Sequence, residues 1–205
     1  MAVDKPLFRE IFAALPTTVA VLTTLDADSI PRGLTVNAIC AVSASPPLLL
    51  ACVDKTSDTL PALVASRVFV VNFLAAHAAE SSRRFAGKGA DKFAGLDFRP
   101  AARAGGAPIL LDQVVAHAEC VVHDVIEAGD HWLFLGRIEG GGVHSRAPLI
   151  YYRRAYAAWP PGDGRKGAPS PAAPFRPDGH APVFTGPGNE TEAATATSAA
   201  ATITQ

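Results

Sequence analysis

A lysine and three hydroxyl side chains follow one apolar stretch of the chain and could together bind a phosphate. The apolar residues 48–53 are followed by a polar segment that contains Lys55, Ser57 and Thr59 and precedes a short predicted helix. Hydroxyl groups and free backbone N–H groups at a helix start donate hydrogen bonds to anions, and the helix dipole favours negative charge. Alternatively, Ser57 or Asp58 caps the helix and Lys55 is a solvated loop charge.

A second group of cations lies after an Ala-rich segment, residues 75–85, that we expect to be helical. Arg84 belongs to the last turn of this helix, where a cation suits the helix dipole, and Lys92 follows in a glycine-containing loop. Phe85 and Phe93 lie close to these charges in the sequence. The cations could neutralise a phosphate while an aromatic side chain covers a ring, or they could be ordinary surface charges.

Three histidine and carboxylate side chains fall on one face of a long predicted strand, residues 114–126. They are His117, Glu119 and His123, and the opposite face of the strand is apolar. Their i, i+2, i+6 spacing matches no recognised metal site. We therefore predict no metal and interpret them as satisfied polar residues or interface residues.

The composition indicates a globular protein and excludes several classes of partner. Of the 205 residues, 49% are hydrophobic and 18% are charged, and the formal net charge is −1. A chain of this length can bury a sizeable core. Since no cluster of lysine and arginine stands out, we expect neither nucleic acid nor an anionic membrane as the main partner.

The apolar runs and the cysteines favour a cytoplasmic protein. The longest apolar runs, residues 46–53 and 68–76, are too short to span a bilayer, and the N-terminus shows no apolar segment of a secretory signal. Cys40, Cys52 and Cys120 are odd in number and stand among apolar neighbours, without a CxxC pattern. We expect all three to be reduced cysteines of the core.

Hydrophobic periodicity predicts a mainly β domain with a few helices, either an α+β fold or a β-barrel. The glycines at positions 140–142 are expected to loosen the chain, and residues 132–135, apolar on both faces, to lie between a barrel and a partner or helix. We assign residues 1–158 to the folded domain and residues 159–205, rich in Pro, Ala, Gly and Thr, to a disordered tail. Strands are predicted at residues 19–24, 34–42, 48–53, 68–74, 114–126, 131–138 and 148–152, and helices at residues 60–66 and 75–85. A further helix is predicted to begin with Asp4 as its cap and Pro6 in its first turn, and to end at Pro16.

Taken in order, several segments resemble the flavin reductase-like family, the FMN-binding split-barrel proteins that act as reductase components of two-component flavin monooxygenases. The resemblance runs from Phe8 to Tyr156 and is carried by the segments TVNAICAVSASPPLLLACV, KTSDT, FVVNFL, RRFAGKGADKF, GAPIL, HAECVV, GDHWLFLGRI and PLIYYRRAY. It implies a six-stranded FMN-binding split β-barrel, a homodimer, and a flavin at the barrel rim near the subunit interface.

The resemblance also implies which residues contact the flavin and the nicotinamide. The segments that match flavin-contacting strands of the family are Thr35, Val36, Asn37 and Ala38, together with Ala51, Cys52 and Val53. Residues matching the phosphate and ribityl loop are Lys55, Ser57 and Thr59, and those matching a second flavin-contacting segment are Arg84, Phe85, Ala86, Lys92 and Phe93. His131 matches a residue on the nicotinamide side of the site, and Tyr152 stands where a late aromatic side chain borders the pocket.

The implied activity is that of an NAD(P)H:flavin oxidoreductase. It would reduce FMN or FAD with NADH or NADPH and release reduced flavin, which diffuses to a partner monooxygenase. His131 would orient the nicotinamide or its carboxamide, or it is a hairpin residue satisfied by Glu119 or the backbone. Two alternatives remain open, a flavin carrier or redox sensor without rapid NAD(P)H turnover, and the related barrels that oxidise pyridoxamine phosphate or bind haem. The Gly129-Asp130-His131 sequence favours the reductase.

Overall fold

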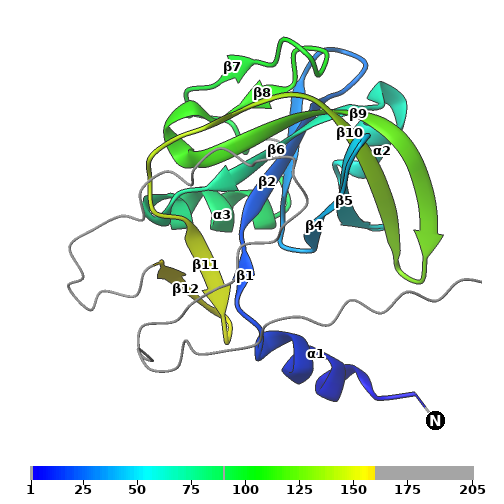
Figure 1. The fold of residues 1–205 in the computed structure, drawn as a ribbon, viewed down its shortest axis with the longest axis vertical. Helices are drawn as coiled ribbons and strands as arrows, with labels where there is room; N and C mark the ends of the chain where they lie inside the picture. Colours follow the sequence, from blue (N-terminus) through cyan, green and yellow to red (C-terminus); the bar gives the residue numbers. More distant parts are fainter. Residues whose placement is uncertain (1, 90, 160–205) are drawn as a thin grey trace, which may run out of the picture. The chain divides into compact units, whose positions relative to one another are not determined.

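Seven strands form one antiparallel sheet whose first and last strands are consecutive in the sequence (Figure 1). The computed structural model describes residues 2–89 and 91–159. The sheet has the order β3-β2-β6-β9-β10-β5-β4, and only Asn37 and Ala38 separate β3 (Pro31–Val36) from β4 (Ile39–Ala44). Three Cα–Cα steps span about 10 Å at most. The two ends of the sheet must therefore meet, and the sheet curls into a barrel.

The mainly β character agrees with the prediction, but one predicted strand is divided. Residues 34–42 were expected to form a single strand, whereas the chain leaves the ladder at Asn37 and Ala38. The reason is that β3 pairs with β2 while β4 pairs with β5, at opposite ends of the sheet order. The break raises the strand number from the expected six to seven.

The remaining strands of the barrel and the smaller elements lie close to their predicted positions. The other barrel strands are β2 (Ala20–Leu25), β5 (Pro47–Asp54), β6 (Val68–Leu74), β9 (Val114–Ala128) and β10 (His131–Val143). The helices and 3-10 turns are α1 (Lys5–Ala13), α2 (Leu60–Ser66), η1 (Ala76–Ala78), α3 (Ala79–Ala86) and η2 (Leu111–Gln113). Short strands outside the barrel are β1 (Thr17–Thr18), β7 (Arg99–Pro100), β8 (Pro108–Ile109), β11 (Leu149–Tyr152) and β12 (Ala155–Ala158), and of these only β11 was predicted.

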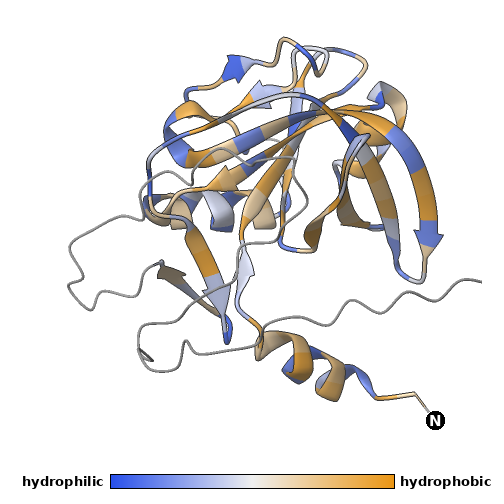
Figure 2. Cartoon of the chain, in the orientation of Figure 1, coloured by the Kyte–Doolittle hydropathy of each residue, from blue (hydrophilic) through white to orange (hydrophobic). Residues whose placement is uncertain are grey.

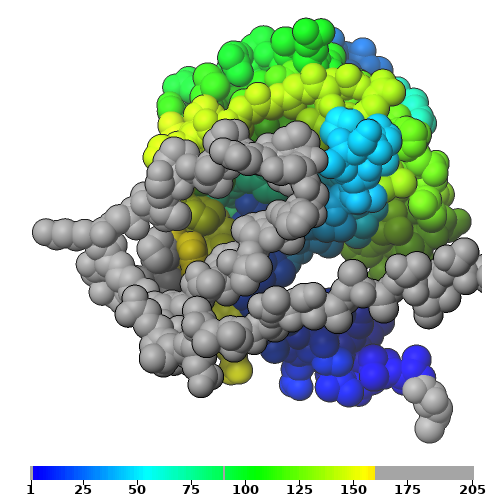
Figure 3. Space-filling view, in the orientation of Figure 1, coloured from blue at the N-terminus to red at the C-terminus, as the bar shows by residue number. Residues whose placement is uncertain are grey.

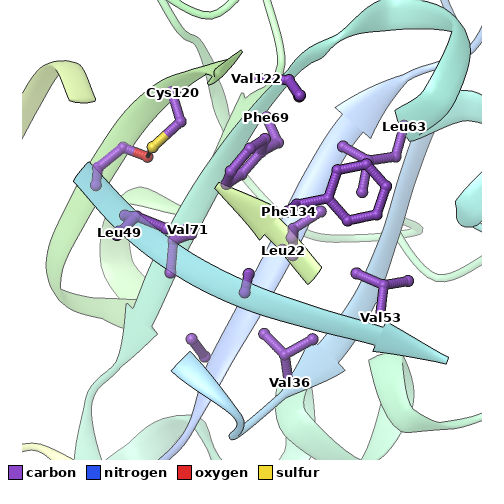
Figure 4. Packing of buried hydrophobic residues seen from close by; sticks show 13 residues of the cluster. Leu22, Val36, Leu49, Val53, Leu63, Phe69, Val71, Cys120, Val122 and Phe134 are labelled. Carbon is purple, nitrogen blue, oxygen red and sulfur yellow. Dashed lines mark hydrogen bonds between the residues drawn. The ribbon is translucent and has the colours of Figure 1, made fainter. Parts of the chain in front are cut away.

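The barrel interior is filled by apolar side chains from six of the seven strands and from α2. Figure 4 shows Phe69 of β6 and Phe134 of β10 among the aliphatic side chains, with Leu63 of α2 at one side. Phe69, Phe134 and Leu63 are all fully buried. Burying a side chain of this size contributes about 1.5–3 kcal/mol. The interior is thus a packed core, and ligands must bind at the rim or the outside.

Two further clusters cover the outside of β6 and its neighbours. One lies under α3 and contains Phe85, and the other lies under the segment that carries β7 and β8. Asn72 of β6, fully buried, links this second cover to the barrel. Its amide donates to the carbonyl of Pro108 at 3.2 Å and to Thr23 Oγ1 at 3.1 Å, and its Oδ1 accepts from the Leu110 N–H at 2.9 Å.

The glycine run at positions 140–142 does not loosen the chain, and that expectation is wrong. Gly140, Gly141 and Gly142 belong to β10 and pair with β9. The absent side chains make room for His117, because a Cβ at position 142 would lie 2.7 Å from His117 Cε1. Burial lowers the pKa of His117, which faces Glu119 on its own strand. Within residues 2–89 and 91–159, no three His, Cys, Asp or Glu side chains are grouped to hold a metal ion.

The three cysteines differ in exposure, and the expectation of three core cysteines is wrong for two of them, Cys40 and Cys52. Cys120 is fully buried, and its burial raises the pKa of the thiol to about 12. Cys52 is half-buried, and Cys40 is exposed. Cys40 is exposed because Ile39 beside it on β4 packs against the barrel core, which directs Cys40 outward.

Apolar side chains also lie on the outer face of the barrel, where nothing in the described part of the chain buries them fully. On β5 and β10 they are Leu48, Leu50, Leu133 and Leu135, all half-buried. Leu135 pairs with Leu50, and Leu133 with Cys52. Phe134 points into the core, as predicted for one face of residues 132–135, and the covering of their other face by a partner or helix stays a prediction. We call these four leucines the outer leucine face.

The N-terminal helix α1 begins as predicted but lies on the surface. Asp4 caps it, because Asp4 Oδ1 accepts from the Leu7 N–H at 2.9 Å. Phe8 and Phe12 remain 53% and 55% exposed. Figure 2 shows much of α1 in the colour of hydrophobic residues. None of the described helices has the length and hydropathy needed to cross a membrane. The predicted tail, apart from Trp159, lies outside the described residues.

Candidate functional site

The two strand segments expected to contact a flavin lie side by side at the barrel rim. The N–H of Cys52 donates to the carbonyl of Ala38 at 3.0 Å, which joins the β3–β4 connection to β5. Thr35 Oγ1 donates to the carbonyl of Ser82 at 2.7 Å and so fixes β3 to α3. Asn37 and Ala38 are exposed, while Val36 is buried in the core. The exposed backbone at this connection can face a planar ligand.

The loop after β5 is ordered by its own side chains. Asp54 Oδ1 accepts from the Thr56 N–H at 2.7 Å and from Thr56 Oγ1 at 2.8 Å, and these bonds lower the pKa of the Asp54 carboxyl. Neither Ser57 nor Asp58 occupies the cap position of α2, so that alternative is wrong. Thr59 is the N-cap residue, and its N–H donates to Ser57 Oγ at 3.3 Å.

Lys55 is held by the β9–β10 hairpin and does not line a pocket with Thr59. Its ammonium forms an ion pair with Glu127 and lies 5.6 Å from the centroid of the Trp132 ring. Its backbone N–H donates to the carbonyl of Asp130 at 3.0 Å. Lys55 therefore ties the loop to the hairpin. No spacing signal in the sequence connects Lys55 to Glu127, because the contact is made only when β5 pairs with β10.

His131 lies at the start of β10, directly opposite Asp54 of β5. Its Nδ1 is 2.7 Å from Asp130 Oδ1, and its side chain is 41% exposed. This hydrogen bond lowers the pKa of the Asp130 carboxyl. Glu119, suggested as a possible partner, accepts instead from the Arg103 N–H at 2.6 Å, so that detail is wrong. With Nδ1 engaged, His131 would present Nε2 to a ligand.

A first small pocket brings Thr59, Lys92 and Phe93 together at the start of β3. Lys92 Nζ donates to the carbonyl of Gly33 at 3.2 Å and to that of Phe85 at 3.4 Å. Burial lowers the pKa of the Lys92 ammonium. Phe93 stacks edge-to-face on Phe85, with their ring centroids 4.9 Å apart. A polar head group held here would thus meet a half-buried cation.

Five residues of this first pocket were not predicted as site residues. They are Pro31, Arg32, Gly33, Asp58 and Gly89. A Cβ on Gly33 would lie 2.9 Å from Phe85 Cε1, so only glycine allows α3 to approach β3 this closely. Arg32 is already paired, with its Nη2 2.9 Å from Asp26 Oδ2. A glycine in the middle of a strand pattern is the one sequence signal that could have found this position.

A second cavity of about 210 Å³ lies at the other end of β3. We call it the ring cavity. Thr35, Asn37 and Ala86, three of the residues expected at the flavin, line it together with Tyr151 and Tyr156. Tyr156 is fixed in place by a 2.9 Å hydrogen bond between its hydroxyl and Ser82 Oγ.

Not all of the residues expected at the flavin line these two pockets, and Tyr152 and Arg84 line neither of them. Tyr152 is exposed, and its hydroxyl accepts from Arg153 Nε at 3.0 Å, while its neighbours Tyr151 and Tyr156 face the ring cavity. The alternation of side chains along a strand produces this difference. Arg84 is exposed and donates to the carbonyl of Ala94 at 2.7 Å, so it holds the loop that carries Lys92.

The chain is similar to known proteins over most of the described residues. Residues 12–160 match the model of the flavin reductase like domain. The chain is 44% identical over 160 residues to flavin reductase (NADH) of Kitasatospora aureofaciens, which covers 77% of this chain and 83% of that protein. It is 35% identical over 161 residues to the flavin-dependent monooxygenase reductase subunit HsaB of Rhodococcus jostii, covering 78% of this chain and 80% of HsaB.

Solved structures show the same fold. The NADH:FAD oxidoreductase SgcE6 of Streptomyces globisporus, in complex with NAD and FAD fragments, superimposes with a TM-score of 0.72 at 32% identity, over 80% of this chain and 99% of that one. Flavin reductase PheA2 superimposes with a TM-score of 0.69 at 29% identity, over 76% and 98% of the two chains. The predicted split barrel is confirmed. The chain therefore belongs to the flavin reductase-like domain family.

Proposed function

We propose that this flavin reductase takes its hydride from NADH, holds the flavin along β3, and supplies reduced flavin to a flavin-dependent monooxygenase. The observation that carries the proposal is the position of β3, which has a small pocket lined by Lys92, Arg32 and Asp58 at its start and the ring cavity at its end. A flavin mononucleotide has the same division into a phosphate end and a ring end. The relatives named above support the choice of NADH and of a monooxygenase as recipient.

The ring end of the flavin would lie against the exposed connection between β3 and β4. Backbone groups of Asn37 and Ala38, next to Cys52 on β5, can hydrogen-bond the polar edge of an isoalloxazine ring. The chain fixes this edge from two sides, because Thr35 is bonded to α3 and Ala38 to Cys52. The residues present fit a flat heteroaromatic ring with hydrogen-bonding groups along one side.

The phosphate end would lie at Thr59 and Lys92, in the first pocket. Lys92 donates two of its three N–H groups to backbone carbonyls, which fixes the position of the ammonium. The third N–H group is left to donate to an anion. A bound phosphate would also offset the burial that lowers the pKa of this ammonium. We do not assign Lys55 to the phosphate, because Glu127 already neutralises it.

The chemistry of hydride transfer belongs to the nicotinamide and the flavin, which must stack at roughly 3–3.5 Å. The chain contributes orientation. His131 stands beside the loop that follows β5, and Asp130 holds its ring through Nδ1. We assign to His131 Nε2 a hydrogen bond to the carboxamide of the nicotinamide, which positions the ring and transfers no proton.

A homodimer is the oligomeric state that the outer leucine face favours. Leu48, Leu50, Leu133 and Leu135 form an apolar patch on two paired strands, and the exposed Val42 extends it onto β4. Apolar patches of this kind are usual at permanent interfaces between copies of one chain. We expect L135K to convert a dimer into a monomer in multi-angle light scattering. The control V64K, at an exposed position on α2, should leave the mass unchanged. A wild-type monomer at micromolar concentration would contradict this assignment.

The reductase activity is tested by NADH oxidation with and without added FMN, FAD or riboflavin. We expect oxidation to depend on added flavin. Flavin binding without NADH oxidation would instead identify a carrier or redox sensor. A H131A variant should raise the KM for NADH with a smaller change in kcat, since the assigned contact is one of binding.

The phosphate assignment is tested with Lys92→Gln and two flavins that differ only in the phosphate. We expect the KM for FMN to rise about tenfold or more, as for loss of a hydrogen bond to a charged group, and the KM for riboflavin to change about twofold at most. Arg137→Gln is the control, because Arg137 is exposed on β10 and paired with Glu139. An equal change for FMN and riboflavin would mean that Lys92 only supports the loop.

A further inference from the structure

An apolar cavity with a volume of about 200 Å³ lies between α2 and the β9–β10 hairpin. Figure 3 shows this hairpin in green at the surface of the molecule. We call the cavity the α2 cavity. The described residues that line it are Leu63, Val64, Arg67, Val122, Val125, Trp132 and Phe134. It shares none of them with the first pocket or with the ring cavity, so it is separate from the candidate flavin site.

The inner end of the α2 cavity is part of the barrel core. Leu63 and Phe134 are fully buried, and Figure 4 shows them beside each other. Trp132 is half-buried and packs against the same core. Val64, on the outer side of α2, is 56% exposed. The cavity therefore has an apolar, partly aromatic inner end and an outer end at the surface.

Arg67 provides the positive charge at the outer end of the α2 cavity. Its backbone is fixed, because its N–H donates to the carbonyl of Leu63 at 3.1 Å and its carbonyl accepts from the Val122 N–H at 2.8 Å. Arg67 is exposed, and no ion pair within residues 2–89 and 91–159 involves it. A guanidinium binds a carboxylate through two parallel N–H groups. The charge of this cavity is thus complementary to a carboxylate held at its mouth.

The volume of the α2 cavity limits its ligand to a single ring. A cavity of about 150 Å³ lined by aliphatic and aromatic side chains holds one benzene molecule. Sites for larger organic ligands begin at about 300 Å³, which excludes a whole flavin or nicotinamide nucleotide. The rings of Trp132 and Phe134 favour an aromatic ligand, since aromatic pairs gain more than their buried area alone provides.

We propose that the α2 cavity binds a small aromatic carboxylate, a compound with one benzene ring and one carboxylate group. The ring enters between Leu63, Trp132 and Phe134, and the carboxylate stays at the surface and pairs with Arg67. This arrangement leaves the carboxylate partly hydrated and buries only the apolar part of the ligand. The inference goes beyond the proposed function and does not depend on it, because no flavin or nicotinamide is needed for binding.

The test follows the indole N–H signals of the full chain by NMR during titration with benzoate, benzamide or acetate. The chain has two tryptophans, and W132F identifies the signal of Trp132. We expect benzoate to shift the Trp132 signal and to leave that of Trp159, which does not line the cavity, unchanged. Benzamide has the ring without the charge, and acetate has the charge without the ring. Both should bind about tenfold or more weakly than benzoate.

Arg67→Gly removes the guanidinium at a position where glycine suits the backbone. Arg67 has a φ of 55°, in the left-handed region, so R67G should fold as the wild type does. We expect R67G to weaken benzoate binding about tenfold or more and to bind benzoate and benzamide equally. R67K, which keeps the charge, should still prefer benzoate. The control Arg9→Gln removes an exposed charge on α1 and should leave the benzoate affinity within about twofold of the wild-type value.

Four results would overturn the assignment. They are no shift of the Trp132 signal with benzoate, equal affinities for benzoate and benzamide in the wild type, equal losses in R67G and R9Q, and displacement of benzoate by FMN or NADH. The last result would place the benzoate in the flavin or nicotinamide site. The titration remains decisive in a protein that reduces no flavin, so failure of the α2 cavity and failure of the reductase function are distinguished.

Discussion

Replacing Asn72 with alanine should lower the free energy of unfolding by about 3–5 kcal/mol, because several buried polar groups lose their partners together. The Asn72 amide nitrogen donates to the carbonyls of Val21 and Pro108 and to the hydroxyl of Thr23. Its Oδ1 accepts from the N–H of Leu110. No water reaches a fully buried site to replace them. The substitution would also release the segment that covers the outer face of β6.

Urea unfolding monitored by tryptophan fluorescence measures this loss. Gln113→Ala is the matched control, because Gln113 is half-buried and its side chain accepts one hydrogen bond, from Ser81 Oγ at 2.8 Å. We expect the control substitution to lower the free energy of unfolding by about 1 kcal/mol. If N72A were no more destabilised than Q113A, then Asn72 would not be the link between the barrel and its cover.

Replacing Gly141 with alanine should lower the free energy of unfolding nearly as much as replacing Asn72. A Cβ on Gly141 would lie 2.6 Å from the backbone carbonyl oxygen of His117. The strand β9 cannot retreat, because His117 is paired with Asn72 of β6 on its other side. We therefore expect Gly141→Ala to lower the free energy of unfolding by about 2–4 kcal/mol, the range for steric overpacking against a fixed neighbour.

Gly87→Ala provides the comparison for this prediction. Its Cβ would meet only the carbonyl oxygen of Arg84 at 3.4 Å, and its φ of −74° suits any residue. We expect its free energy of unfolding to change by about 0.5 kcal/mol or less. Equal stability of G141A and G87A would show that β9 and β10 can separate locally without cost.

The sequence predicted those parts of the fold that depend on local pattern. Alternating apolar residues located β2, β6, β9 and β10, and Asp4 identified the start of α1. The glycine run failed as a prediction because its meaning is not local. Glycine loosens a chain when its surroundings are open, but here His117 on a neighbouring strand occupies the space. Only the pairing of β9 with β10 reveals this.

In the candidate site, too, some features could be predicted from the sequence, while others depend on strand pairing. The segments at residues 35–38 and 51–53 were assigned through the resemblance, and the barrel brings them together through the Ala38–Cys52 hydrogen bond. The partner of Lys55 and the face of Tyr152 could not be predicted. Each depends on strand register, and a shift of one residue reverses which side chain points inward. Whether these residues contact flavin stays a prediction.

The order of strands has a consequence for synthesis on the ribosome. The β4–β5 hairpin leaves the ribosome early, but the free edge of β5 pairs with β10. Leu48, for example, pairs with Arg137 and therefore stays unpaired on that side until β10 has been synthesised. Local hairpins form quickly, whereas pairings between distant segments are slow and leave strand edges open meanwhile. The nascent chain therefore carries an unpaired, leucine-rich strand edge from the emergence of β5 until the emergence of β10. The barrel closes only after β10 has emerged, so no ligand that requires the closed barrel can act as an early folding template.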